Sequence, residues 1–318
     1  MNRPPPTVRR ATIDDIPAAI EVATAALGWT PGEPHEAFFR WKHLENPAGA
    51  SPMWLAIDDG AAVGFRTMLR WTFHDEAGEL RPAARAVDTA THPDHERRGI
   101  FRALTTEAVD DLTSEGVAFV FNTPNDNSRP GYLRMGWRDV GRIPTRVAVA
   151  GPRSLPRLAR ARTAARKWSE PCPAGTPVEQ AIDDLVALER ATPRPPALTT
   201  VRSRDHLLWR YGFEPLHYRV LRTDAAAAVV RLRRRGPALE AVLAEIFSPD
   251  AASTRHLLRA VRRQLPADHL LTLAATPHPA PWLPTLPRLG PRLTVRDLAA
   301  AGPDRDRFRF SLGDIELF

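Results

Sequence analysis

Residues 87–104 read VDTATHPDHERRGIFRAL, and this stretch decides the predicted fold. An apolar run ends near Thr91, a short polar loop follows, and apolar residues at helical spacing begin near Ile100. This order predicts a strand, a loop and the start of a helix. The first N–H groups of a helix have no partners within the helix and lie at the positive end of its dipole, so such a junction can bind phosphate oxygens.

The loop also carries residue types that suit a phosphate group. Gly99 permits close approach of a ligand to the backbone. Three arginines add positive charge at the same place, namely Arg97, Arg98 and Arg102. The segment therefore predicts an anion site, with a solvated basic turn as the alternative.

A second informative segment, residues 122–137, follows an apolar strand predicted at Val117–Phe121. Ser128 can serve as N-cap and Gly136 as C-cap, which leaves a helix of barely two turns. Such a short helix fixes the place of Tyr132 and little else. Because Gly131 and Arg134 flank this tyrosine, and a core residue more often has apolar flanks, we expect it to act in a site, with a plain core aromatic as the alternative.

The rest of the chain alternates strand and helix patterns. In the first half we expect strands at Val8–Ala11, Trp54–Asp58, Ala62–Phe73 and Arg85–Thr91, and helices that end near Leu27 and span Phe101–Glu115. In the second half we expect helices at Pro177–Ala191, His206–Tyr211 and Ser253–Gln264, and strands at Tyr218–Leu221, Ala227–Arg233, Leu239–Phe247, Leu270–Ala274 and Phe308–Phe318. This mixture excludes the all-α and all-β classes and predicts an α/β fold.

The length of 318 residues exceeds what one hydrophobic core usually organises, so we expect two domains. A basic, proline-rich stretch at residues 151–173 predicts a linker with one basic helix between domains at 1–150 and 174–318. Residues 1–150 hold 17 Lys and Arg against 20 Asp and Glu, whereas residues 151–318 hold 27 against 17. The basic second half could attract RNA or another anion, or could be an arginine-coated, solvated surface.

The two segments resemble motifs A and B of the GNAT superfamily of acyltransferases. The motif B pattern Asn-x-x-Ala-x-x-x-Tyr-x-x-x-Gly-Phe is matched by Asn125, Ser128, Tyr132, Gly136 and Trp137, with conservative changes at the Ala and Phe places. The two motifs lie about 30 residues apart, as in the family, and the resemblance covers roughly residues 8–145.

Motif A is usually Gln/Arg-x-x-Gly-x-Gly/Ala, and residues 96–101 keep only its central glycine, Gly99. Glu96 replaces a Gln or Arg, and Phe101 replaces a small residue. The resemblance implies a GNAT fold, with a mixed, mostly antiparallel sheet flanked by helices. The departures concern the pyrophosphate contact rather than the fold.

The resemblance also implies acetyl-CoA, or another acyl-CoA, as co-substrate without a metal. The pantetheine arm would enter a gap between the strand ending at Thr91 and the strand at 117–121, and the pyrophosphate would lie on the loop. The residues expected to bind it are Ala90, Thr91, His92, Arg97, Arg98, Gly99, Ile100, Phe101, Arg102, Asn125 and Ser128. An acceptor amine would attack the thioester directly, and Tyr132 would protonate the leaving thiolate as general acid.

Asp88 lies inside a strand, where an unpaired charge would be costly. We expect it to be the catalytic base or a substrate-binding carboxylate, or else to form a structural salt bridge. His92 and His95 are alternative bases, and with Asp94 they crowd one turn too closely for a metal site. The acceptor pocket is expected near the cluster of Trp29, Trp41, Lys42, His43, Glu45 and Asn46.

The second half lacks both motifs. Residues 205–211 and the mixed strands after them resemble the degenerate second half of tandem GNAT proteins, with 308–318 as a final strand. That resemblance implies a duplicated fold, either a monomer with pseudo-dimeric halves or a homodimer. An unrelated cap domain is the alternative.

Three functions of different classes fit these observations. The first is an N-acetyltransferase acting on a small amine, the second an aminoacyl-tRNA-dependent transferase, and the third a non-catalytic acyl-CoA-binding protein. The single cysteine, Cys172, excludes a disulfide within the chain, and no secretory signal is visible at the start. The longest apolar run, residues 225–230, is too short to span a membrane, so we expect a cytoplasmic protein.

Overall fold

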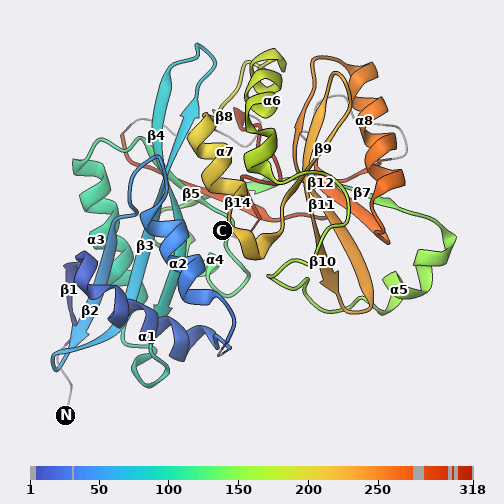
Figure 1. Ribbon diagram of the computed structural model, residues 1–318. Helices are drawn as coiled ribbons and strands as arrows, with labels where there is room; N and C mark the ends of the chain where they lie inside the picture. The colour runs from blue at the N-terminus through green and yellow to red at the C-terminus, as the bar shows by residue number, and fades with distance from the viewer. Residues whose placement is uncertain (1–4, 31, 275–282, 300–302, 304–306, 317–318) are drawn as a thin grey trace.

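The computed structural model describes residues 5–30, 32–274, 283–299, 303 and 307–316. Two β-sheets lie side by side, and helices cover their faces (Figure 1). The predicted α/β class is therefore confirmed, and the two-sheet arrangement agrees with the predicted tandem organisation. Within the described residues, no helix is both long enough and apolar enough to cross a membrane.

The first sheet is built mainly from the N-terminal half. Its strands follow the order β1 (Thr7–Arg10), β2 (Met53–Asp58), β3 (Ala61–His74), β4 (Leu80–Thr91), β5 (Phe119–Asn122), β14 (Arg292–Asp297) and β6 (Arg138–Arg142), and β8 (Thr199–Thr200) pairs with β3. Of these pairs, only β4 and β5 run parallel. The sheet is therefore mixed and mostly antiparallel, as predicted.

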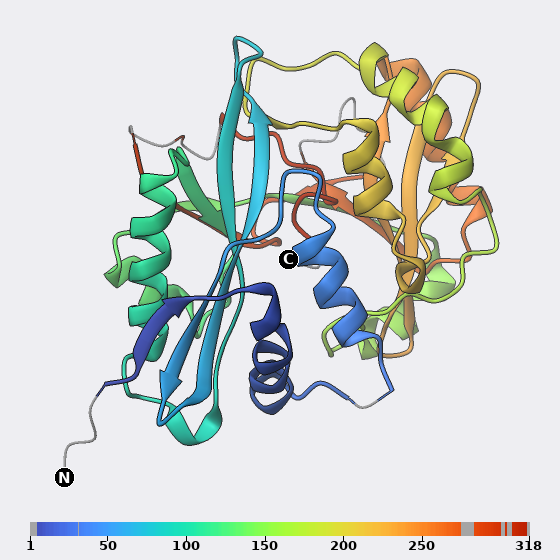
Figure 2. The same cartoon turned by 60° about the vertical axis from the view of Figure 1, so that its left-hand side comes forward.

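Helices cover both faces of this sheet, because successive side chains along each strand point to opposite faces. On β2, Leu55 packs in the core beneath α1 (Ile16–Leu27), whereas Trp54 packs beneath α3 (Ile100–Ser114). Helix α2 (His35–Leu44) lies on the α1 side, and the two-turn α4 (Arg129–Arg134) on the α3 side (Figure 2).

The second sheet has the order β13 (Thr285–Leu286), β7 (Thr145–Val149), β12 (His269–Leu273), β11 (Ala238–Phe247), β10 (Ala227–Arg235) and β9 (Arg219–Arg222). Helices α6 (Val178–Ala191) and α7 (Arg204–Tyr211) cover one face, and α8 (Ala251–Gln264) covers the other. The basic helix expected in the linker is α5 (Leu155–Arg160).

The two sheets exchange strands, since β14 and the short β8 of the second half both join the first sheet. Strand β7 follows β6 in the chain but pairs with β12 and β13, whereas β14 lies between β5 and β6 of the first sheet. Each sheet thus contains a strand from the other half of the chain. The domain limits at residues 150 and 173 stay a prediction.

The strand predicted at 308–318 is wrong for the part that the structure describes. Phe308 makes one isolated bridge to Leu198, and residues 311–316 form turns. The alternating apolar residues of this segment pack in the core between the sheets, and the ring of Phe310 stacks on Phe121 of β5. Burial rather than strand pairing therefore explains the alternation. Residues 317 and 318 lie outside the described residues.

An aromatic contact joins the two halves beside α2. The ring of Trp41 stacks on that of Trp209 in α7 with centroids 5.4 Å apart. Each indole N–H donates to the backbone oxygen of the other residue, at 2.9 and 3.0 Å. Helix α2 is thereby fixed to the second half.

Candidate active site

Strands β4 and β5 separate as the predicted site requires. They pair at only three positions, the last joining Arg85 to Phe121. Beyond it β4 continues to Thr91, whereas β5 ends at Asn122. The edge of β4 that faces β5 therefore has no strand partner over its last six residues.

A β-bulge lies on this open stretch. The β3–β4 register shifts between Arg66 and Thr67, so that Asp88 is the extra residue on β4. Its φ of 28° is a strained value for a residue with a side chain. The amide of His92 donates to Val63 of β3, and backbone groups alternate along a strand. The N–H of Thr91 therefore points away from β3, toward the open edge.

The bulge turns the Asp88 carboxylate toward α2. It forms an ion pair with the Nζ of Lys42 and a hydrogen bond of 2.8 Å with the Nε2 of His43. The Nδ1 of His43 lies 2.9 Å from the Oγ of Ser51. Lys42 and His43 are fully buried, whereas the Asp88 side chain is 25% exposed, so Asp88 is the member of this group that a ligand can reach.

Electrostatics fix the protonation states of this group. Burial would raise the pKa of Asp88, but the charge of Lys42 and the hydrogen bond from His43 outweigh it and hold that pKa well below its usual range. Burial lowers the pKa of His43 to about 4, so its ring is neutral at pH 7. Since Asp88 is an ionised acceptor, the Nε2 of His43 carries the ring proton.

A cavity of about 350 Å³ opens onto Asp88. Its walls come from the end of α1 and the loop after it, from α2, from the linker and from β10: Leu27, Trp29, Phe38, Phe39, Lys42, Ala165, Arg166, Lys167 and Arg233. Of the cluster expected at the acceptor site, Trp29 and Lys42 line this cavity. Trp41 instead joins the two halves, and Asn46 donates to the backbone oxygen of Arg70.

The predicted phosphate loop ends at the start of α3. The first backbone bond there runs from Ala103 N to Gly99 O, so the N–H groups before it are left without helical partners. Gly99 has φ of 76°, and a Cβ added to it would meet no atom within 4 Å. The loop backbone is therefore accessible to a ligand.

The three loop arginines differ in their surroundings. Arg97 and Arg102 are exposed at the loop. Arg98 instead forms an ion pair with Asp58 of β2, and its Nη1 lies 2.9 Å from the Nδ1 of His95. In the described part of the chain, no group of three or more His, Cys, Asp and Glu side chains is placed to hold a metal ion.

Tyr132 lies on the α3 side of the sheet and is 4% exposed. Its hydroxyl accepts a hydrogen bond of 2.8 Å from the Nη2 of Arg66, a fully buried residue of β3. The Arg66 guanidinium lies 5.2 Å from the centroid of the Tyr132 ring and 5.6 Å from that of Phe101. Within the part of the chain that the structure describes, the Nε and Nη1 of Arg66 have no hydrogen-bond partner.

Arg66 is the site residue that sequence reasoning missed. The signal was present, because Arg66 follows Phe65 in the middle of a predicted strand. The same reasoning that selected Asp88, a charge inside a strand, applies to Arg66.

Asn125 and Ser128 shape the start of α4. The Oδ1 of Asn125 accepts from the N of Ser128 at 2.8 Å and from its Oγ at 3.0 Å. Ser128 holds the N-cap position, but its own side chain makes no capping bond. The Phe101 ring packs against Gly131, where a Cβ would lie 3.0 Å from it, and meets the Tyr132 ring edge to face. Phe101, the large residue in motif A, thus packs against Gly131, a small residue in motif B.

Comparisons with known proteins agree with this geometry. The family model for the GNAT acetyltransferase domain matches residues 7–140. A mycothiol acetyltransferase from Nocardiopsis dassonvillei is 32% identical over 108 residues, which are 34% of this chain and 29% of that protein. The chain therefore matches less than a third of this relative's length.

Two solved structures share the fold of nearly the whole chain. A protein from Enterococcus faecalis V583, described as a probable N-acyltransferase, has a TM-score of 0.65 at 12% identity over 92% of this chain and 72% of that one. A GCN5-related N-acetyltransferase from Kribbella flavida has a TM-score of 0.62 at 15% identity, with the same coverage. The family match over residues 7–140, which is less than half of the chain, identifies a GNAT acetyltransferase domain there, and the motifs and the parting of β4 from β5 agree with it.

Proposed function

We propose that this protein is an N-acetyltransferase that moves an acetyl group from acetyl-CoA to a small amine. The observation that carries the proposal is the open edge of β4, with a phosphate-type loop at its end, Tyr132 on one face of the sheet and the Asp88 cavity on the other. The loop N–H groups and Arg97 would hold the pyrophosphate, and the Thr91 N–H would meet the pantetheine arm.

Tyr132 is the proposed general acid. Its oxygen accepts from Arg66, so the hydroxyl hydrogen remains available for donation. As the amine nitrogen bonds to the thioester carbon, the C–S bond breaks and the sulfur takes the Tyr132 proton. The proton that the amine loses passes to water in the cavity, and the phenolate is reprotonated from solvent.

Asp88 is proposed to bind the acceptor rather than to act as a strong base. A carboxylate with a lowered pKa is a weak base but can accept a hydrogen bond from the N–H of a neutral amine. The cations around it lower the pKa of a bound amine, which favours the neutral nucleophile.

Titration calorimetry with acetyl-CoA tests the phosphate loop. In Gly99→Ala a methyl group enters the open space at the loop, and we expect the Kd for acetyl-CoA to rise about tenfold or more. Gly116→Ala, at the other end of α3, is the matched control, because Gly116 has φ of 78° and also faces open space. Equal changes of the acetyl-CoA Kd in the two variants would show that the loop does not bind the cofactor.

Thiol release then tests transfer itself. A set of amines incubated with acetyl-CoA should give free thiol and N-acetylated product in equal amounts. Binding of acetyl-CoA without thiol release for any amine would instead support the non-catalytic acyl-CoA-binding function.

A further inference from the structure

The cavity beside Asp88 is lined by more positive than negative charge. Four of its lining side chains are cationic, namely Lys42, Arg166, Lys167 and Arg233, and Asp88 is the one carboxylate among its lining residues. The other lining groups are mostly aromatic or aliphatic. The cavity therefore does not match a polycationic acceptor.

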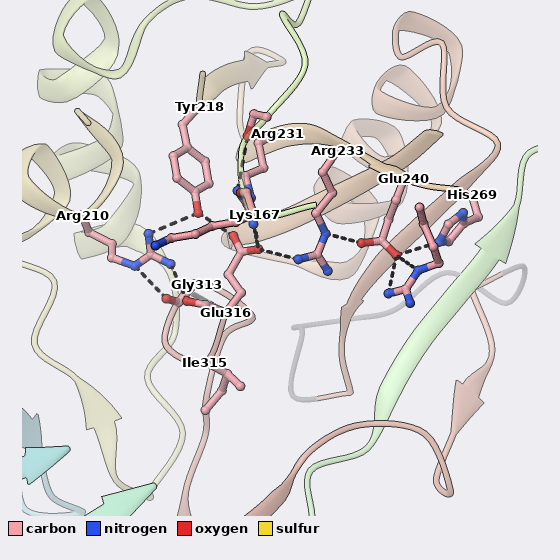
Figure 3. A network of polar contacts seen from close by, with 12 residues as sticks. Lys167, Arg210, Tyr218, Arg231, Arg233, Glu240, His269, Gly313, Ile315 and Glu316 are labelled. Carbon is pink, nitrogen blue, oxygen red and sulfur yellow. Dashed lines mark hydrogen bonds and ion pairs between the residues drawn. The ribbon is translucent and has the colours of Figure 1, made fainter. Parts of the chain in front are cut away.

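Two of these cations have anionic partners within the protein. Lys42 pairs with Asp88. Arg233 pairs with Glu240 and lies 3.9 Å from Glu316 (Figure 3). Their charges are already balanced.

Lys167 differs from these residues. Among the described residues its ammonium has no ion-pair partner, and it lies 3.9 Å from the Phe38 ring centroid and 4.7 Å from that of Trp168. Burial first, and the charge of Lys42 second, lower the pKa of Lys167 to about 8, so it is still mainly protonated at pH 7. Asp88 and Glu33 attract this ammonium without pairing with it directly, so an anion that enters the cavity and contacts it would stabilise a cation that is partly removed from water.

The wall that carries Lys167 is held in place. Its backbone oxygen accepts a hydrogen bond of 2.9 Å from the Nη1 of Arg231, whose guanidinium also binds the Glu316 carboxylate at 2.9 Å (Figure 3). The amide of Arg166 donates to the backbone oxygen of Arg234 at 2.7 Å. The Lys167 backbone is thus fixed before a ligand arrives.

We propose that the acceptor is an amine that also carries an oxyanion, such as a carboxylate or phosphonate, on an apolar body. Lys167 pairs with the oxyanion, the body packs against Trp29 and Phe38, and the amine lies at Asp88. This inference rests on the proposed acetyltransferase function for its reacting amine, but the oxyanion contact can be tested without turnover.

Tryptophan fluorescence measures binding alone, because Trp29 lines the cavity and Trp168 lies beside Lys167. We expect phenylacetate to bind about tenfold or more tightly than its neutral isostere phenylacetamide, as for a hydrogen bond to a charged group. Lys167→Met should abolish the difference. Arg162→Met, which removes an exposed charge of the same linker outside the cavity lining, should keep it. Equal affinity in the unmodified protein, or a preference that survives Lys167→Met, would overturn the inference.

Thiol release with acetyl-CoA supplies the second arm, using phenylalanine, its aminophosphonate analogue and phenethylamine as acceptors. We expect kcat/KM about tenfold or more higher for the two anionic amines, and Lys167→Glu should reverse the order. Equal rates for all three would reject the anionic acceptor while the acetyltransferase function stands. Preferential binding of phenylacetate without thiol release from any amine would reject the acetyltransferase while the oxyanion site stands.

Discussion

Replacement of Tyr132 by Phe tests the mechanism most directly, because it deletes one oxygen atom and keeps the ring. The ring contacts with Phe101 and Trp137, with centroids 5.3 and 5.1 Å away, do not involve the hydroxyl. The acetyl-CoA site should therefore keep its shape, and the Kd for acetyl-CoA should change less than about twofold. Loss of a general acid typically costs about 10²–10⁴-fold in rate.

The same substitution has a second, smaller consequence. Two buried nitrogens of Arg66 lack partners among the described residues, and loss of the phenol oxygen leaves its Nη2 unpaired as well. Leaving a buried group unsatisfied costs about 1–3 kcal/mol, so Tyr132→Phe should also lower the free energy of unfolding by that amount. A fall in activity must therefore be separated from a fall in the folded fraction.

Tyr211→Phe is the matched control. Its hydroxyl is also buried and hydrogen-bonded, at 2.8 Å to Glu245 of the second half, so its removal should destabilise the protein similarly. We expect kcat from thiol release to fall about 10²–10⁴-fold in Tyr132→Phe and less than about threefold in Tyr211→Phe, both measured well below their unfolding midpoints. Equal kcat in the two variants would refute Tyr132 as the proton donor.

Three further predictions follow from single contacts. In Gly64→Ala the new Cβ would lie 2.7 Å from the Cγ2 of Ile100, so urea unfolding should show a loss of about 1–3 kcal/mol; an unchanged midpoint would mean that α3 shifts freely over β3. Arg66→Met removes a buried charge with unmet hydrogen bonds, so stability should stay equal or rise while kcat falls; unchanged kcat would dismiss Arg66 as the residue that positions Tyr132. Lys167, on which the charges of Lys42, Asp88 and Glu33 act, loses its proton as the pH rises through about 8, so phenylacetate affinity should fall there and be flat in Lys167→Met.

The first half of the fold was predictable because its signals are local. Periodicity and turn residues placed the strands near residues 54–73, and Gly28 ends α1 in the left-handed conformation expected of a C-cap. The exchange of β7 and β14 was not predictable, since nothing in five or six residues states which sheet supplies the partner strand. The strand prediction for the segment after Phe308 was wrong for a related reason. Alternating apolar residues also occur where a chain crosses a hydrophobic core without pairing with a strand.

The candidate site likewise has one part that could be predicted from the sequence and one part that could not. The expected cofactor side, with Gly99 at a helix start and Tyr132 in a two-turn helix, is encoded in short motifs that can be read from the sequence. The expected acceptor side is assembled from α2, a linker and β10, which lie far apart in the chain. Lys167 stands in a basic stretch with no pattern that separates it from its neighbours, and only the fold shows that it faces Phe38.

This division has a consequence for how acceptor specificity can change. The Asp88 bulge and the loop at Gly99 belong to the sheet that would hold acetyl-CoA, so substitutions there alter binding and transfer together. The backbone of the wall formed by residues 165–167 is instead hydrogen-bonded to Arg231 and to the backbone of β10. Among the described hydrogen bonds, none joins this wall to the phosphate loop. Its side chains can therefore vary without disturbing the phosphate loop, and on the proposed function the charge at position 167 would select one class of amine over another.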